Sequence, residues 1–135
     1  LVAALDSTDV LRKAMSIFGG HGIMEDFSAL PRLFRDSAIN ELWEGPRNVL
    51  LTQMHRDLQR VAAWYPPDAV VRDLLEGAPE DVVAPLVAEA AALISHRSLL
   101  TPDEATIAVA GRWDRFADDL MHGIQDQALR EVEGG

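Results

Sequence analysis

Glu44 is the side chain in this sequence that is best placed for acid–base chemistry. It lies at a junction between two helical patterns, because Gly45 stops the first pattern and Pro46 starts the second. A carboxylate at a helix C-terminus faces the negative end of the helix dipole, and burial against Trp43 and Leu42 would raise its pKa further. Both effects favour a general base. The residues alone leave open the alternative of a solvated glutamate at a helix end.

A second candidate site is the cluster of glycines at Gly19, Gly20 and Gly22, directly after a helical pattern. Glycine adopts the left-handed conformation without a Cβ clash and lets other groups approach the backbone closely. The cluster therefore predicts either a backbone contact with a ligand or a plain helix cap and turn. The residues alone leave both readings open.

No other chemistry is indicated by residue type and spacing. The sequence holds no cysteine, which excludes disulfides, thiolate catalysis and cysteine-rich zinc sites. The four histidines, His21, His55, His96 and His122, show no metal-binding spacing and form no Ser–His–Asp set. We therefore predict no metal site, and we expect His55 to be a surface histidine or one with satisfied hydrogen bonds.

Helical periodicity runs through the whole chain, and no strand is predicted. We expect helices over residues 6–18, from Pro31 to about Gly45, over 46–63, over 69–76, from Pro79 to His96 and from Thr101 onwards. Asp6 or Ser7 is predicted to cap the first helix, and Pro85 to kink or restart the fifth. The expected buried face of the 46–63 helix is Val49, Leu50, Met54, Leu58, Val61 and Ala62. The predicted fold class is all-α, an antiparallel helical bundle.

The last helix has the clearest start signal. Thr101 is the predicted N-cap, Pro102 the first helical residue and Glu104 the partner in a capping box. Its apolar residues recur at spacings of four and three, as expected for a bundle seam. They are Val109, Trp113, Phe116, Leu120, Ile124 and Ala128.

Charge divides the chain at Trp64-Tyr65-Pro66-Pro67. Residues 1–63 carry 8 acidic and 7 basic side chains, whereas residues 64–135 carry 14 acidic and 5 basic ones. The net charge of −10 argues against nucleic-acid binding, which needs a basic face. No apolar run approaches the roughly 20 residues of a membrane span, so no membrane partner and a cytoplasmic location are expected. The chain begins at Leu1 in a helical pattern without methionine, which indicates part of a longer protein.

Residues 19–49 resemble the C-terminal α-helical domain of the acyl-CoA dehydrogenase flavoproteins. They read GGHGIMEDFSALPRLFRDSAINELWEGPRNV. The Gly-Gly-x-Gly turn, an acidic residue, a proline, Arg35-Asp36 and an aromatic-Glu-Gly motif follow in the family's order. The resemblance covers residues 6–63 well. It implies a core of the family's helices over residues 1–63 and an acidic helical extension over 64–135, packed on the same bundle.

The resemblance implies α,β-dehydrogenation of an acyl-CoA thioester, a reaction of fatty acid metabolism. Glu44 would be the base that removes the α-proton, and its backbone N–H would donate to the thioester carbonyl. Trp43 and Gly45 would line the substrate pocket. An electron-transfer flavoprotein would be the electron acceptor, and the enzyme would be a homodimer or homotetramer.

The implied cofactor is FAD, contacted at two places. Pro46, Arg47, Asn48 and Val49 match the family segment that contacts FAD. Gly19 and Gly20 match the turn that approaches the pyrophosphate-adenosine part of an FAD held by a neighbouring subunit. Ser16 stands where the family commonly has glutamine, one turn before that contact.

Two departures separate this chain from most of the family. Pro46 replaces the usual threonine, and Trp43 with Asn48 resembles the DNA-alkylation-response, AidB-like branch and its longer relatives. The N-terminal helical and central β-domains of the family cannot fit in this chain, so we expect the chain alone to be inactive. The alternatives are an AidB-like alkylation-response flavoprotein and a non-catalytic helical oligomerisation module.

Overall fold

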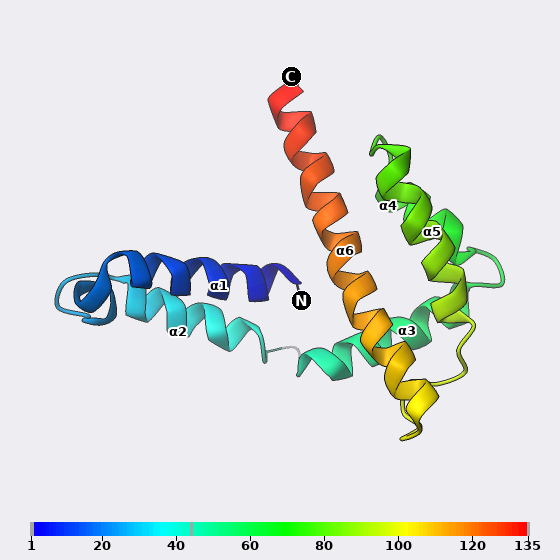
Figure 1. Cartoon of the computed structure of the whole chain (residues 1–135), viewed down its shortest axis with the longest axis horizontal. Helices are drawn as coiled ribbons and strands as arrows, with labels where there is room; N and C mark the ends of the chain where they lie inside the picture. Colours follow the sequence, from blue (N-terminus) through cyan, green and yellow to red (C-terminus); the bar gives the residue numbers. More distant parts are fainter. Residues whose placement is uncertain (1, 44, 135) are drawn as a thin grey trace. The chain divides into compact units, whose positions relative to one another are not determined.

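The computed structural model describes residues 2–43 and 45–134, and every regular element within them is helical (Figure 1). The elements are α1 (Val2–Ile17), the 3₁₀-helix η1 (Gly19–Ile23), α2 (Leu30–Asn40), α3 (Arg47–Val61), α4 (Pro67–Leu74), α5 (Glu80–Ile94) and α6 (Glu104–Gly134). The all-α fold class is therefore confirmed.

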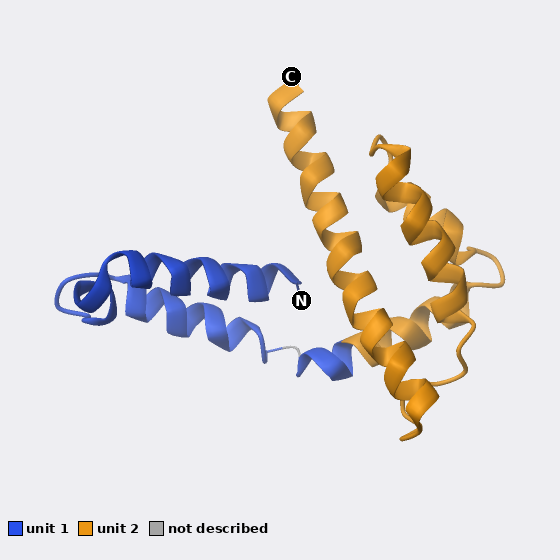
Figure 2. Cartoon of the chain, viewed as in Figure 1, with its two compact units in different colours: residues 1–50 blue, residues 51–135 orange. Residues whose placement is uncertain are grey.

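The chain forms two compact units, which Figure 2 shows in different colours. Unit 1 comprises residues 1–50 and unit 2 comprises residues 51–135. The division falls inside α3, whereas the sequence favoured a break after residue 63.

Unit 1 is a hairpin of α1 and α2 closed by η1. Its seam consists of small polar side chains, because Thr8 and Ser37 are buried. Ser37 Oγ lies 2.6 Å from Ser7 Oγ and 3.1 Å from Thr8 Oγ1. The hydroxyls of Ser7 and Thr8 also donate to the backbone carbonyl of Ala4. Hydrogen bonds rather than large apolar side chains therefore align these two helices.

The predicted cap of α1 is wrong. The helix already begins at Val2, so Asp6 and Ser7 lie inside it. The Ser7 hydroxyl bonds backwards to a carbonyl rather than forwards to a free N–H group. The apolar residues before Asp6 extend the helical pattern and override the local capping signal.

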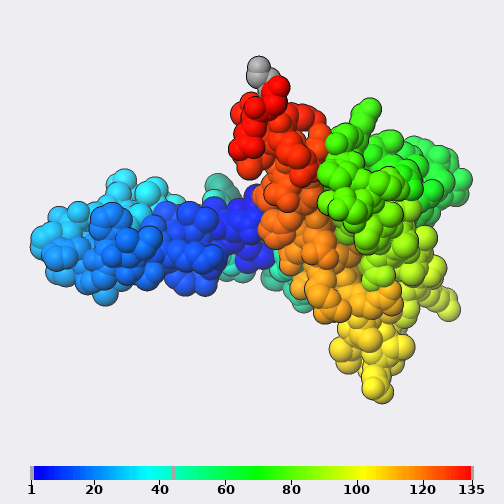
Figure 3. Space-filling view, turned by 45° about the horizontal axis from the view of Figure 1, so that its top comes forward, coloured from blue at the N-terminus to red at the C-terminus, as the bar shows by residue number. Residues whose placement is uncertain are grey.

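Unit 2 holds the main apolar core, contributed by α3, α4, α5 and α6. Its buried members are Leu51, Val71, Leu75, Val83, Leu86, Ala90, Leu93, Ile94, Trp113, Phe116 and Ala117. Gly123 on α6 is buried, and an added Cβ there would lie 3.1 Å from Leu75 Cδ2. The absence of a side chain at Gly123 lets the α4–α5 pair pack closely on the second half of α6 (Figure 3).

The predicted buried face of α3 is wrong in part. Leu50, Leu58, Val61 and Ala62 are half-buried, whereas Met54 is 43% exposed and Val49 is also exposed. The buried residues of α3 are Leu51 and His55. Polar contacts explain this difference. Gln59 donates hydrogen bonds to the backbone carbonyls of Ile94 and His96, so this side of α3 faces the end of α5. The spacing of apolar residues in the sequence cannot predict such hydrogen bonds.

Two other helix features bear on the predictions. Pro85 was predicted to kink or restart the fifth helix, and the restart is wrong, because Pro85 lies inside a single α5 that runs from Glu80 to Ile94. The cap of α6 is Asp103, whose Oδ1 accepts from the Thr106 N–H at 2.9 Å. Thr101 instead accepts from the Asp103 N–H through its carbonyl, which forms a turn before the helix. Asp103 takes the capping position because that turn delays the helix start to Glu104.

Candidate functional site

The predicted catalytic segment lies between α2 and α3 in unit 1. The proposed base, Glu44, lies outside the described residues. Its neighbour Gly45 has φ 115°, a conformation suited to glycine, and donates its N–H to the Leu42 carbonyl at 3.0 Å. The Pro46 carbonyl accepts from the N–H groups of Val49 and Leu50, which forms the first turn of α3.

The end of α2 was predicted too late. The helix stops at Asn40 and is followed by a turn that includes Leu42 and Trp43. Leu42 is 67% exposed and Trp43 is 79% exposed. Neither Leu42 nor Trp43 is therefore buried within this chain.

The second predicted segment is the glycine turn between α1 and α2. Gly19 has φ 54°, and neither Gly19 nor Gly20 has an atom within 4 Å of the position of a Cβ. Gly22 differs, because an added Cβ there would collide with the Met15 carbonyl. The turn thus combines one structural glycine with two whose backbone is open to an incoming group. The Ser16 hydroxyl donates to the Lys13 carbonyl at 2.7 Å, so its hydrogen is already used locally.

Side chains from the loop and from α2 hold this turn. Arg35 forms an ion pair with Glu25, and both side chains are exposed. The rings of His21 and Phe27 meet edge to face with centroids 4.8 Å apart. Arg35 is therefore part of an exposed ion pair beside the turn.

The two predicted segments lie at opposite ends of α2 (Figure 1). The helix spans 11 residues, which corresponds to a length of about 16 Å. Ser16, Gly19 and Gly20 lie near its start, whereas Trp43, Gly45, Pro46, Arg47, Asn48 and Val49 follow its end. The two predicted segments are therefore separate in this chain, and we call them the two candidate half-sites. Arg47 is half-buried, and Asn48 and Val49 are exposed at the start of α3.

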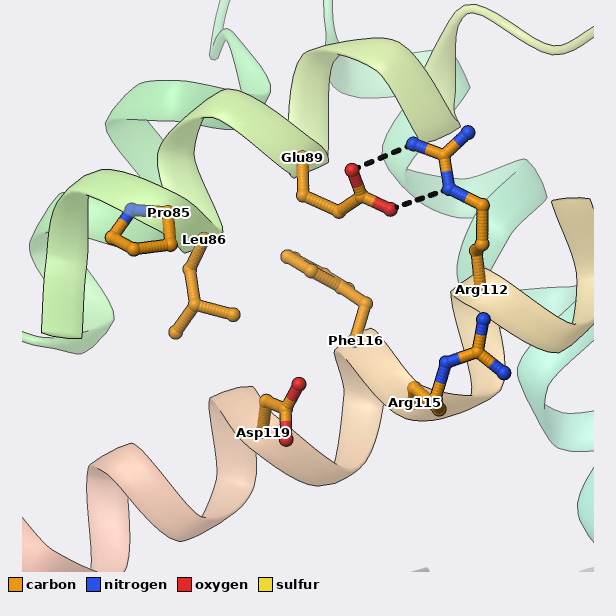
Figure 4. A pocket seen from close by; sticks show the side chains of 7 residues that line it. All are labelled: Pro85, Leu86, Glu89, Arg112, Arg115, Phe116 and Asp119. Carbon is orange, nitrogen blue, oxygen red and sulfur yellow. Dashed lines mark hydrogen bonds and ion pairs between the residues drawn. The ribbon is translucent and has the colours of Figure 1, made fainter.

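A groove of about 440 Å³ lies between α5 and α6 in unit 2, and it was not predicted from the sequence (Figure 4). It is lined by Pro85, Leu86, Glu89, Arg112, Arg115, Phe116 and Asp119. Arg112 donates from Nε and Nη2 to the two oxygens of Glu89 at 2.7 and 2.6 Å. The bond from Arg112 lowers the pKa of Glu89 despite its partial burial, and the charges of Arg112 and Arg115 add to the effect. Glu89 is therefore an ionised structural partner rather than an acid or base.

One signal in the sequence could have pointed to this groove. Glu89 is the only charged residue of α5 after Asp81, so a carboxylate interrupts an otherwise apolar helix. Such a residue needs a partner, because a lone charge on an apolar face is costly.

No metal or membrane site is found. Across residues 2–43 and 45–134, no group of three or more His, Asp or Glu side chains is placed to hold a metal ion. No helix in the same residues combines the length and the apolar character needed to cross a membrane.

Comparison with known proteins bears on the first part of the chain. Residues 1–59 match the family model described as acyl-CoA dehydrogenase, C-terminal domain. A segment of 53 residues is 40% identical to the putative acyl-CoA dehydrogenase AidB of Escherichia coli (strain K12), covering 39% of this chain and 10% of that protein. A segment of 50 residues is 40% identical to acyl-CoA dehydrogenase family member 11 of Caenorhabditis elegans, covering 37% of this chain and 8% of that protein.

The chain thus matches about a tenth of the length of these relatives. No solved structure matches it significantly. The matched residues include both half-sites and the whole of unit 1. Residues 1–59 of this chain are therefore similar to the C-terminal domain of the acyl-CoA dehydrogenases.

Proposed function

We propose that this chain is the C-terminal part of an FAD-dependent acyl-CoA dehydrogenase-like oxidoreductase. The observation that carries the proposal is the family match over residues 1–59, which includes the Trp43-Glu44-Gly45 motif. The reaction would place a double bond between the α and β carbons of an acyl thioester. Residues outside that match would supply a helical extension.

The reacting carboxylate in this proposal is Glu44. It would take the α-proton as the Cα–H electron pair forms the new double bond, and its backbone N–H would stabilise the thioester oxygen. FAD, when bound, would accept the hydride that leaves the β-carbon. Trp43 would cover the substrate, since its exposed ring needs an apolar partner. Gly45 would let the thioester approach the backbone, because it carries no side chain.

The described residues fit an anionic cofactor at both half-sites. The start of α3 places the positive end of its helix dipole beside Arg47. Asn48 and Val49 are exposed on the same turn. At the other half-site, the backbone of Gly19 and Gly20 has free space around it. Pro46 contributes only its carbonyl, so it would position the turn rather than donate to the cofactor.

A charge-removing variant of the longer protein tests this role. Glu44→Gln keeps the shape of the side chain and removes the base, so we expect loss of flavin reduction by acyl-CoA with the flavin still bound. The measurement is the flavin absorbance under anaerobic conditions across a panel of acyl-CoA chain lengths. Glu41→Gln is the matched control, because it removes a nearby carboxylate outside the motif. Unchanged reduction in Glu44→Gln would reject the assignment.

The same proposal includes an expectation for the isolated chain. We expect it to reduce no acceptor, including an electron-transfer flavoprotein, because it covers about a tenth of the relatives' length. Turnover of an acyl-CoA by the purified 135-residue chain would contradict this expectation.

A second candidate function is a helical module for homo-oligomeric assembly. The observation that favours it is the apolar exterior of unit 1 around its hydroxyl-lined seam. Large apolar side chains more than 40% exposed there are Val10, Ile17, Phe18, Ile23, Met24, Phe27, Leu33, Ile39, Leu42, Trp43 and Val49. Exposed apolar side chains in this number would favour a surface that another protein covers. Light scattering would test it: a dimer or tetramer is expected, and a monomer at high concentration would exclude the module.

The two functions give different results in the parent protein. A flavin that is reduced by an acyl thioester supports the enzyme. A bound flavin that no thioester reduces supports an AidB-like alkylation-response flavoprotein. A protein without flavin leaves assembly as the function. Nucleic acid is not an expected partner, because the net charge is −10.

A further inference from the structure

His55 is a buried titratable side chain at the meeting point of three helices. It is 0% exposed, and its Nε2 lies 3.0 Å from the backbone carbonyl oxygen of Leu93 at the end of α5. A carbonyl only accepts hydrogen bonds, so Nε2 carries the hydrogen. A neutral imidazole has a single N–H, and Nδ1 is therefore bare. Nδ1 has no hydrogen-bond partner among the described residues.

The third helix at this point is α6. The Trp113 ring meets the His55 ring edge to face, with centroids 5.4 Å apart and planes at 82°. Trp113 Nε1 in turn donates to the Leu51 carbonyl, one turn before His55 on α3. These contacts tie α3 to both α5 and α6, and we call the set of His55, Leu93, Trp113 and Leu51 the α3 junction. It contains no carboxylate that could balance a charge on the ring.

The nearest titratable neighbour lies just beyond α5. His96 Nε2 is 3.1 Å from Thr106 Oγ1, and that hydroxyl donates its own hydrogen to Asp103 Oδ2. Since the Thr106 hydroxyl has a single hydrogen, the His96 ring donates to Thr106. Among the described residues, His96 is the group whose charge acts on His55, and it opposes a second positive charge. From α6 the packed side chain is Trp113, which does not titrate.

We propose that the α3 junction is an acid-labile latch, closed while His55 is neutral and opened when its ring takes a second proton. The added Nδ1–H would have no acceptor, and the new charge would be buried among apolar side chains. A buried unpaired charge is removed either by loss of the proton or by opening of the structure to water. Opening would release α3 from α5 and α6.

The direction in which the stability of unit 2 changes with pH follows from the lowered pKa of His55. Burial lowers the pKa of His55 from its ordinary value of 6.5, the bond to Leu93 opposes this in part, and the charge of His96 lowers it further. The unfolded chain thus binds the proton more readily than the folded one. The stability of unit 2 is fully present above about pH 6.5 and is lost as the pH falls below that value.

The latch has a consequence for the first half-site. The helix α3 carries both His55 and the segment Arg47–Val49. Release of its second half would loosen the helix on which the proposed FAD contacts lie. This consequence rests on the proposed function, whereas the latch itself is tested without any cofactor.

The test uses the whole chain with Trp43→Phe and Trp64→Phe, so that Trp113 is the only tryptophan. Urea unfolding is followed by Trp113 fluorescence between pH 7.5 and pH 5.5. We expect the unfolding equilibrium constant to rise as the pH falls, by up to about tenfold per pH unit for one proton. His55→Gln should remove this dependence, because its amide can donate to Leu93 but cannot charge.

His21→Gln and His122→Gln are the matched controls, and both should keep the dependence, since His122 is exposed on α6 and His21 lies in unit 1. A wild-type chain with no pH dependence in this range would overturn the latch. So would a His55→Gln chain with the wild-type dependence. If His55→Gln does not fold, an NMR titration of the His55 ring in the wild-type chain tests the latch instead. An apparent pKa below 6.5 supports the latch, and a value at or above 6.5 rejects it.

Discussion

Trp113 Nε1 on α6 donates a hydrogen bond of 2.8 Å to the backbone carbonyl of Leu51 on α3, and the ring that does so is only 1% exposed. The ring also stacks on Phe116 at a centroid distance of 5.3 Å and meets His55 edge to face. One side chain thus combines apolar burial, aromatic packing and a long-range polar bond. The seam predicted for the last helix correctly included this residue, although its polar partner could not be foreseen.

We expect Trp113→Phe to destabilise unit 2 by about 2–4 kcal/mol. The change leaves a buried carbonyl without its donor, which costs about 1–3 kcal/mol, and the smaller ring leaves a cavity. The measurement is urea unfolding followed by circular dichroism. Trp64→Phe is the control, because Trp64 is 75% exposed, and it should change stability by less than about 0.5 kcal/mol. Equal effects of the two variants would contradict the packing described for Trp113.

The glycine turn of unit 1 gives a second matched pair. Gly22→Ala should destabilise the hairpin by about 1–3 kcal/mol, because its Cβ would collide with the Met15 carbonyl and the backbone must move. Gly20→Ala should have little effect on stability, because nothing lies within 4 Å of its Cβ position. Helical circular dichroism during thermal unfolding measures both. A larger loss of stability in Gly20→Ala than in Gly22→Ala would contradict the close contact described between Gly22 and the Met15 carbonyl.

Two variants at the start of α6 distinguish the observed N-cap, Asp103, from the predicted N-cap, Thr101. Asp103→Ala should lower the urea midpoint, because Asp103 accepts from the N–H of Thr106 and from its hydroxyl. Thr101→Ala should leave the midpoint nearly unchanged. The same bonds to Thr106 lower the pKa of Asp103 from 3.8, so the stability that Asp103 provides is present above about pH 4 and is lost on further acidification. A stronger effect of Thr101→Ala would restore the capping box expected from the sequence.

The ion pair of the groove should contribute little. Glu89→Gln breaks the bidentate pair with Arg112, but the two side chains are 33% and 45% exposed. Solvent screening therefore limits the expected loss to less than about 1 kcal/mol, and the loss should shrink in 1 M salt. Glu76→Gln is the control, since it removes an exposed carboxylate near the end of α4. A loss of several kcal/mol in Glu89→Gln would mean that the pair is effectively buried.

The sequence predicted the helices well and their ends and faces less well. Gly19 and Gly77 follow helices and adopt positive φ, as expected for glycines that terminate helices. The face of α3 was misassigned because His55 and Gln59, two polar residues, point inwards and bond to carbonyls of the α5 end. Hydrophobic periodicity carries no information about such partners, which lie 35 to 38 residues away in the sequence.

The candidate site shows the same limit. The aromatic-Glu-Gly motif and the glycine turn were recognised by resemblance to a family, and the match over residues 1–59 supports that recognition. The sequence alone did not predict that the two half-sites are separated by the length of α2; this separation is seen only in the structure. The groove of unit 2 was not predicted, because Glu89 and Arg112 are 23 residues apart and neither belongs to a motif.

The sequence separations of the two seams imply an order in time. The hydroxyl contacts of unit 1 join residues 29 and 30 positions apart, whereas the bond from Trp113 to Leu51 spans 62. Shorter loops close faster, so we expect the α1–α2 hairpin to form early during synthesis. The second half of α3, although made before α4, must wait for α6 before its inward side chains are covered. During that interval its apolar side chains are exposed to solvent, which favours aggregation or binding by a chaperone.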